Sequence, residues 1–210
     1  MSDGVLPASG GNRNLTRTDG QVGSERRALV TGHAGHTVWL TGLSGSGKSS
    51  IAYSVEAALV DRGIAAYVLD GDNVRLALNR DLGFSPEDRT ENIRRVGEVC
   101  RLFQDAGLVV ISAFISPYRA DRSTVRALHP AGTFSEVFVD ASLETCEERD
   151  VKGLYARART GEIPEFSGVS APYEEPAEPD LHLDASEPLE TCVLAVLRHL
   201  GIGREPETVG

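Results

Sequence analysis

A glycine-rich segment near residue 45 restricts the fold of this chain more than any other feature. It reads Gly42-Leu43-Ser44-Gly45-Ser46-Gly47-Lys48-Ser49 and lies between the apolar run Thr37 to Thr41 and the helix-like stretch Ile51 to Val60. Glycines let the backbone point its N–H groups inward, and the following helix presents unpaired amides and a positive dipole end to the same place. A strand, a glycine loop and a helix in this order predict a phosphate-binding loop.

Each part of this loop has an expected role toward a nucleoside triphosphate. Lys48 is expected to reach the β- and γ-phosphates, and the Ser49 hydroxyl is placed to bind Mg²⁺. The loop alone does not name the reaction, but the sequence lacks both the Asn-Lys-x-Asp element for guanine and the Leu-Ser-Gly-Gly-Gln signature of transporters. The predicted ATP-binding residues are Gly42, Leu43, Ser44, Gly45, Ser46, Gly47, Lys48, Ser49 and Ser50.

Length and charge exclude several other classes of protein. A chain of 210 residues suits one domain, and its net charge of −10 disfavours a general nucleic-acid binder. No apolar run is long enough for a membrane span, and residues 1–20 do not resemble a signal peptide, so we expect a cytoplasmic protein with no membrane partner. The three widely spaced cysteines indicate neither a disulfide framework nor a zinc site.

Short apolar runs alternate with helix-period runs along the chain. Strands are predicted at residues 37–41, 65–69, 108–113 and 136–140, with a weaker fifth at 181–183. This alternation predicts an α/β fold with a parallel five-stranded sheet and helices on both faces. Ser85 is expected to cap a helix that begins at Pro86, and the apolar spacing from Leu189 to Leu200 predicts a closing helix. The domain is predicted to span 25–201, between flexible tails at 1–24 and 202–210.

One long segment departs from this alternation. Residues 152–179 combine basic side chains with several glycines and prolines, and only their beginning has helical spacing. Weakly packed, charged segments of this kind are typical of a mobile lid that closes over phosphates, although an ordinary surface loop has the same composition.

A second group of polar residues is predicted at the acceptor side of the site. Asp70-Gly71-Asp72-Asn73 ends the second strand, where ligands bind in a doubly wound sheet, although the same residues also suit a turn. Arginines that converge on one cleft would bind phosphate or sulfate, whereas a single arginine often forms a surface ion pair. Further candidates follow this turn, lie in the helix predicted to begin at Pro86, or follow the third strand. They are Arg75, Arg89, Asn92, Arg94, Arg95, Ile115, Ser116 and Arg119.

These blocks together resemble the adenylylsulfate kinase family, the APS kinases. The similarity runs from about Arg26 to Gly201 and includes the phosphate loop, residues 70–75, 81–95 and 114–119, Lys152-Gly153-Leu154-Tyr155 and Pro172-Tyr173-Glu174. The resemblance implies a P-loop kinase that moves the γ-phosphoryl of ATP onto the 3′-hydroxyl of adenosine 5′-phosphosulfate, with Mg²⁺. It therefore implies that the partner is a small nucleotide substrate and that the enzyme serves sulfate assimilation. The oligomeric state is left open, and a homodimer is one possibility.

The resemblance also implies roles for individual residues. Asp72 would orient or deprotonate the 3′-hydroxyl and bind Mg²⁺ with Ser49, while Lys48 and Ser116 complete the catalytic set; the serine matching Ser116 is regarded in bacterial relatives as a site that can carry a phosphoryl group. Lys152 would bring the lid onto the reacting phosphates. The implied acceptor-binding residues are Asp70, Arg75, Phe84, Arg89, Asn92, Ile115, Ser116, Arg119, Lys152, Leu154 and Phe166, with Phe84 and Phe166 on either side of the adenine.

The sequence departs from the family at three places. Leu76-Ala77 replaces the usual His-Gly, Val151 replaces a lid proline, and the phosphate loop ends in Ser49-Ser50 rather than Ser-Thr. Because Leu76-Ala77 follows Arg75, a kinase for another nucleotide conjugate is an alternative. A nucleotide-binding regulatory module without catalysis is a second alternative, which the presence of Lys48, Ser49 and Asp72 disfavours.

Overall fold

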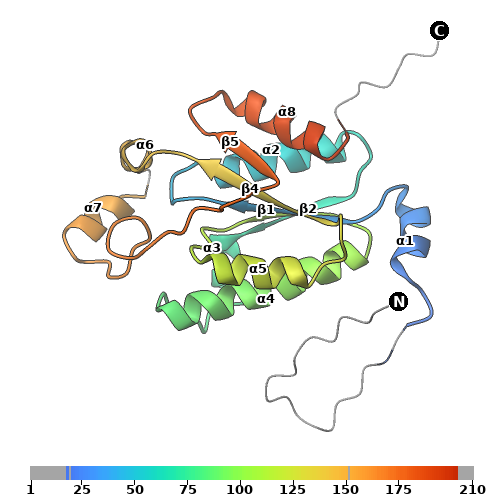
Figure 1. Cartoon of the computed structure of the whole chain (residues 1–210), viewed down its shortest axis with the longest axis horizontal. Coiled ribbons are helices and arrows are strands. Elements are labelled where there is room, and N and C mark those ends of the chain that lie inside the picture. The colour runs from blue at the N-terminus through green and yellow to red at the C-terminus, as the bar shows by residue number, and fades with distance from the viewer. Residues whose placement is uncertain (1–17, 19, 151, 203–210) are drawn as a thin grey trace.

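The computed structural model describes residues 18, 20–150 and 152–202, and these form an α/β fold (Figure 1). Five strands form one parallel sheet in the order β2-β3-β1-β4-β5, as the alternating sequence pattern predicts. The elements are α1 (Ser24–Thr31), β1 (His36–Thr41), α2 (Lys48–Val60), β2 (Ala66–Asp70), α3 (Gly71–Leu76), α4 (Pro86–Asp105), β3 (Val109–Ala113), α5 (Arg119–Ala127), β4 (Phe134–Asp140), α6 (Leu143–Glu148), α7 (Leu154–Arg159), β5 (Leu181–Asp184) and α8 (Leu189–His199).

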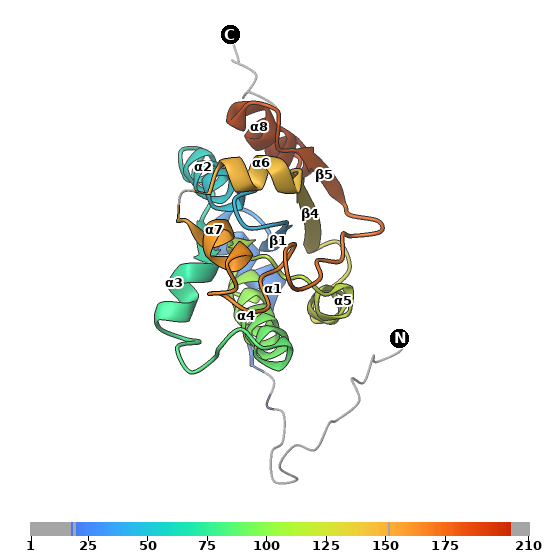
Figure 2. The ribbon, with the colours of Figure 1, turned by 90° about the vertical axis from the view of Figure 1, so that its left-hand side faces the viewer.

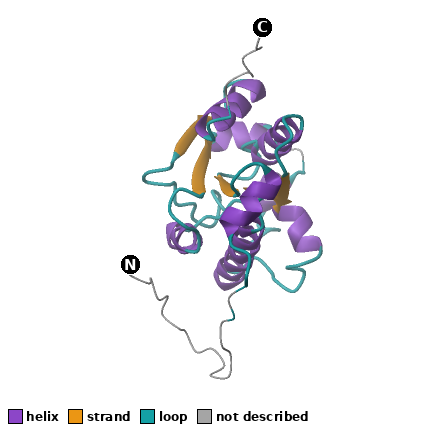
Figure 3. Cartoon of the chain, turned by 90° about the vertical axis from the view of Figure 1, so that its right-hand side faces the viewer, coloured by secondary structure: helices purple, strands orange, loops and turns teal. Residues whose placement is uncertain are grey.

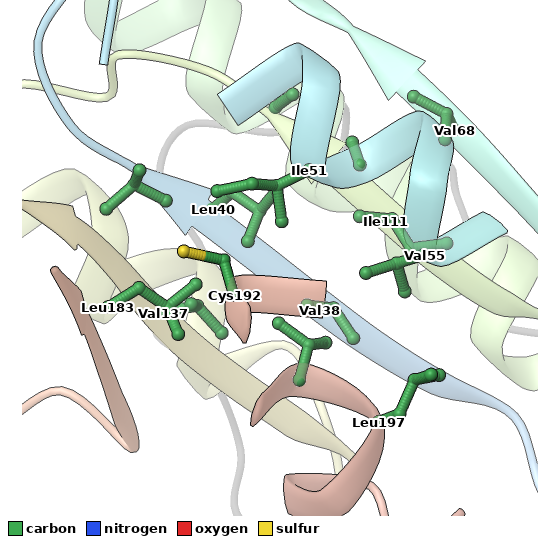
Figure 4. Close-up of a cluster of buried hydrophobic side chains, with 14 of the residues drawn as sticks. Val38, Leu40, Ile51, Val55, Val68, Ile111, Val137, Leu183, Cys192 and Leu197 are labelled. Carbon is green, nitrogen blue, oxygen red and sulfur yellow. The ribbon is translucent and has the colours of Figure 1, made fainter. Parts of the chain in front are cut away.

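Helices cover both faces of the sheet (Figures 1 and 3). Side chains that alternate along β1 point to opposite faces, so Val38 and Leu40 pack in one core while Trp39 packs in the other. The first core, beneath α2 and α8, also contains Ile51 and Leu197 (Figure 4). The second lies beneath α4 and α5. Burial on both faces accounts for the continuous apolar runs of these strands.

The ends of the helices follow from local sequence. Ser85 accepts a hydrogen bond from the Asp88 amide, and Pro86 occupies the first turn of α4, as predicted. The helix α1 was not predicted, and it contacts the end of α4 through Arg27 and Asp105, 2.9 Å apart. The described part of the chain contains no helix that is long and apolar enough to cross a membrane. All three cysteines are free and buried. Most of the two predicted tails lies outside the described residues.

Three histidines lie at the amino-terminal edge of the sheet, away from the phosphate loop. His36 Nε2 and His199 Nε2 each lie 2.8 Å from Ser135 Oγ, and His129 Nε2 lies 3.0 Å from Thr37 Oγ1. The pKa of His36 is lowered to about 4, mainly by burial and also by the neighbouring His199 and His129, while Asp180 acts in the opposite direction. His36 is therefore neutral in the folded protein near pH 6.

This burial predicts a loss of stability in mild acid. In the unfolded chain His36 binds a proton near its ordinary pKa of 6.5, whereas in the folded chain it does so only near 4. The free energy of unfolding should therefore be highest above pH 6.5 and fall as the pH decreases toward 4, by about 1 to 2 kcal/mol after allowance for partial solvent exposure of the ring. Urea unfolding at pH 7.5 and pH 4.5 measures the difference. His36→Gln should reduce it, and the exposed control His182→Gln should not; parallel curves for all three proteins would contradict the assignment.

Candidate active site

The phosphate loop connects β1 to the first residue of α2 at the carboxyl edge of the sheet. Gly45 and Gly47 have left-handed φ angles of 78° and 102°, and Gly42 has φ 155°. A Cβ atom on Gly42 would lie 2.5 Å from the Val139 carbonyl oxygen, so no larger residue fits there. The first turn of α2 receives no side-chain cap from Gly47. Its amides are therefore available to an anion, as the sequence predicts.

Lys48 lies buried across this loop. Its Nζ donates hydrogen bonds to the carbonyl oxygens of Gly42 at 3.0 Å and Leu43 at 2.6 Å, and to Ser46 Oγ at 3.3 Å. Burial lowers the pKa of Lys48 to about 8. The ammonium is thus held at the loop by neutral oxygens, and phosphate oxygens would be stronger partners for it.

Two carboxylates follow β2, and the structure gives them different neighbours. Ser49 Oγ donates to Asp70 Oδ2 at 2.7 Å, and Asp70 Oδ1 accepts from the Asp72 amide at 3.0 Å. The Asp72 carboxylate forms an ion pair with Lys152. The resemblance assigns the metal to Ser49 and Asp72, whereas the contacts bring Ser49 together with Asp70. Asp70 is therefore the carboxylate that lies beside the phosphate loop.

Oxygen donors of this kind suit Mg²⁺. The ion prefers one or two protein carboxylates together with water and substrate phosphates, so the Ser49 hydroxyl and the Asp70 carboxylate form a fitting partial set. In residues 18, 20–150 and 152–202, no group of three or more His, Cys, Asp or Glu side chains is arranged to hold a metal ion.

Arg75, Phe84 and Arg89 form a cluster between α3 and α4. The Arg75 guanidinium lies 4.4 Å from the centre of the Phe84 ring and donates to the Gly83 carbonyl at 2.7 Å. Arg89 is buried and donates to the carbonyls of Phe84 and Glu165 and to Ser167 Oγ. Burial lowers the pKa of both arginines. The cluster therefore links α4 to residues 152–179, the segment predicted to be a lid and called the lid below, at Glu165 and Ser167.

Asn92 is held by a residue that the sequence analysis missed. The buried Asn79 donates from Nδ2 to Asn92 Oδ1 at 2.9 Å. This hydrogen bond uses the side-chain oxygen of Asn92, so the side-chain nitrogen of Asn92 takes no part in it. Nothing in the local sequence distinguishes Asn79 from a turn residue, because the contact joins the α3–α4 connection to the buried face of α4.

Leu154 and Phe166 belong to a small core within the lid. Phe166 is 7% exposed and packs edge-on against Tyr155, with ring centres 4.9 Å apart, while Leu154 lies at the margin of the same cluster. Phe84, by contrast, is 58% exposed. The Tyr155 hydroxyl donates to the Ser44 carbonyl at 2.8 Å, so the lid core contacts the phosphate loop directly. Figure 2 shows α6 and α7 beside this end of the sheet.

The loop after β3 places Ile115, Ser116 and Arg119. Ser116 is 2% exposed, and its φ of 41° lies in the left-handed region. The Trp39 indole donates to Ser116 Oγ at 3.1 Å. Arg119 donates from its guanidinium to the Glu175 carbonyl, toward the end of the lid. A groove of about 520 Å³ runs along that end from Leu43 to residues 168–173 and Glu175.

Known proteins with similar sequences and a similar fold identify the family. The family model described as adenylylsulphate kinase matches residues 34–184. An adenylyl-sulfate kinase from Lactiplantibacillus plantarum is 55% identical over 188 residues, 89% of this chain and 91% of that protein. One from Marinobacter nauticus is 54% identical over 89% of this chain and 94% of that protein.

A solved structure agrees with these relatives. The Mycobacterium tuberculosis APS kinase CysC, in complex with AMPPNP and APS, is 50% identical with a TM-score of 0.77, and the match covers 80% of this chain and 98% of that one. The parallel five-stranded sheet and the phosphate loop described above are therefore those of a kinase enzyme, and the chain belongs to the adenylylsulphate kinase family.

Proposed function

We propose that this enzyme transfers the γ-phosphoryl group of ATP to the 3′-hydroxyl of adenosine 5′-phosphosulfate, forming 3′-phosphoadenosine 5′-phosphosulfate for sulfate assimilation. The observation that carries this proposal is the position of Asp72 and Lys152, paired at the carboxyl edge of the sheet from which the phosphate loop starts. The mycobacterial relative, half identical to this chain, was solved with both AMPPNP and APS.

Phosphoryl transfer requires positioning and charge stabilisation more than covalent chemistry. The loop amides and Lys48 bind the triphosphate and balance the charge that develops on it. Asp72 orients the acceptor hydroxyl and accepts its proton, and Lys152, now paired with Asp72, is placed to turn to the transferred group. Mg²⁺, held by Ser49 with Asp70 or Asp72, would neutralise phosphate charge.

The remaining acceptor contacts follow the clusters in the structure. Arg75, Arg89 and Asn92 hold the phosphosulfate, and Phe84 presents an exposed face to the adenine. Phe166, which is buried against Tyr155, would need lid movement to offer its second face. Ile115 and Ser116 line the pocket. We assign Ser116 a pocket role and not that of a phosphoryl carrier, because its hydroxyl is buried beneath the Trp39 indole.

An acceptor panel tests the reaction. Purified enzyme with Mg²⁺ and ATP should form ADP and a 3′-phosphorylated product in equal amounts when adenosine phosphosulfate is added, as measured by coupled ADP release and mass spectrometry. Leu76, the residue behind the nucleotide-conjugate alternative, is 80% exposed at the end of α3. A higher kcat/KM for another nucleotide conjugate, or no product with any acceptor, would overturn the proposal.

We also propose three properties of the enzyme. They are a cytoplasmic location, a homodimeric state and movement of the lid at 152–179. A relative, the hexameric APS kinase from Thiobacillus denitrificans, is 33% identical with a TM-score of 0.61 over 81% of this chain, and the match covers 30% of that longer chain. Light scattering of the purified protein distinguishes a homodimer from a larger assembly. Hydrogen exchange with and without ATP measures the lid movement.

A further inference from the structure

Arg122 on α5 is a buried cation outside the predicted site residues. It is 2% exposed, and its Nε donates to Glu136 on β4 at 2.6 Å. One NH group donates to the Ser116 carbonyl and the other to the Glu174 carbonyl, each at 2.6 Å. A buried guanidinium is tolerated only when charge and hydrogen bonds are both satisfied. Arg122 meets this condition by joining three segments of the chain.

The first of these segments is the loop after β3, whose backbone is held at three successive carbonyls. Ile115 accepts from Thr41 Oγ1 at 2.7 Å, Ser116 accepts from Arg122, and Pro117 accepts from the Glu174 amide at 2.8 Å. Ser116 has a left-handed φ, which costs energy for a residue other than glycine. Such a conformation persists when its surroundings determine it from several sides. Arg122 and the Trp39 indole hold Ser116 from its carbonyl and its hydroxyl.

The second segment is the end of the lid. Besides its bonds to Arg122 and Pro117, Glu174 accepts a hydrogen bond at Oε2 from the Arg119 amide at 2.7 Å. The adjacent Tyr173 hydroxyl lies 3.0 Å from Thr41 Oγ1. Figure 2 shows the chain after α7 passing beside α5. The loop after β3 and the carboxyl end of the lid therefore form one hydrogen-bonded unit, with Arg122 at its centre.

We propose that Arg122 is a positioning residue for the acceptor nucleotide, acting through the loop 115–117 and the lid end at Glu174. The inference rests on the proposed function, because Ile115 and Ser116 are acceptor-pocket residues only if adenosine phosphosulfate binds there. Arg122 is not in contact with the phosphate loop in any of its hydrogen bonds. Its loss should therefore affect the acceptor far more than ATP.

The test compares Arg122→Met with Arg126→Met. Arg126 lies one turn later on α5 and shares the carboxylate of Glu136, but it bonds to Asp180 and not to the acceptor loop. For Arg122→Met we expect kcat/KM for adenosine phosphosulfate to fall about 10- to 100-fold, since a small displacement of a positioned substrate has effects of this size. The Kd for AMPPNP, measured by calorimetry, should change less than about threefold, and Arg126→Met should preserve both quantities.

A double variant separates positioning from charge neutralisation. Arg122→Met alone leaves the Glu136 carboxylate, which is 13% exposed, without its closest partner and can destabilise the fold, whereas Arg122→Met with Glu136→Gln removes that charge. We expect the double variant to regain thermal stability without regaining kcat/KM for the acceptor. Arg122→Lys should retain only part of the kcat/KM of the unmodified enzyme for the acceptor. Recovery of acceptor kinetics in the double variant, or equal losses for ATP and acceptor, would overturn the inference. Failure of the proposed function is distinct, because the unmodified enzyme would then form no 3′-phosphorylated product.

Discussion

Asp72→Asn is expected to lower kcat by about 10²- to 10⁴-fold while the Kd for ATP changes less than about threefold. The substitution keeps the size of the side chain but removes both the negative charge and the basicity that the acceptor hydroxyl needs in the transition state. It also removes the ion pair with Lys152. Because the phosphate loop binds ATP through its own amides and Lys48, and Asp70 remains beside Ser49 at the metal position, the donor affinity should depend little on this carboxylate.

The experiment combines steady-state kinetics with calorimetric ATP binding. Asp81→Asn is a suitable control, since Asp81 is likewise an exposed carboxylate in an ion pair, here with Arg95, and is not one of the predicted site residues. The control should retain full turnover. A kcat for Asp72→Asn equal to that of the unmodified enzyme would remove Asp72 from its assigned role.

Lys48→Met is expected to lower kcat/KM for ATP by about 10²- to 10³-fold, the size found when one preorganised donor to a developing charge is removed. The thermal stability of the Lys48→Met variant, in contrast, should not fall. The ammonium has only carbonyl and hydroxyl partners among the described residues, so replacing it with an apolar side chain of similar length relieves a desolvation cost. The melting temperature should therefore be unchanged or higher.

The pH dependence gives this prediction a second readout. Burial lowers the pKa of Lys48 to about 8, so the free enzyme loses the charge that attracts phosphate as the pH rises through that value. KM for ATP in the unmodified enzyme should rise above pH 8, and the rise should disappear in Lys48→Met. A KM that stays constant to pH 9.5, or a variant with normal turnover, would contradict the role given to Lys48.

Local features of the fold could be predicted because their causes lie in consecutive residues. The glycines at 42, 45 and 47 specify the loop through the φ angles that only glycine adopts easily. Ser85 and Pro86 specify the start of α4 through one short-range hydrogen bond and one fixed backbone angle. Apolar runs of five or six residues similarly indicated four of the strands, and a weaker, shorter run at 181–183 indicated β5.

Contacts between distant segments could not be predicted in this way. Arg122 contacts Glu174, 52 residues later, and the Tyr155 hydroxyl reaches Ser44, 111 residues earlier. An arginine on an amphipathic helix and a tyrosine near a lid have many sequence interpretations, and only the packing of α5 and α7 selects one. The packing of elements also pairs Ser49 with Asp70. The family resemblance had assigned Asp72 as the partner of Ser49 at the metal.

The sequence by itself determined the phosphate loop and the parallel sheet, because glycine geometry and apolar periodicity act over a few residues. The family followed from the resemblance of its ordered motifs to those of the adenylylsulfate kinases. The tertiary structure alone decided which polar groups are buried together. Ser116 is buried with its hydroxyl bonded to Trp39, and Arg122 links the loop after β3 to Glu174. Burial changes the energy of a charge or a hydroxyl according to the partners it meets, and those partners are set by the packing of whole elements.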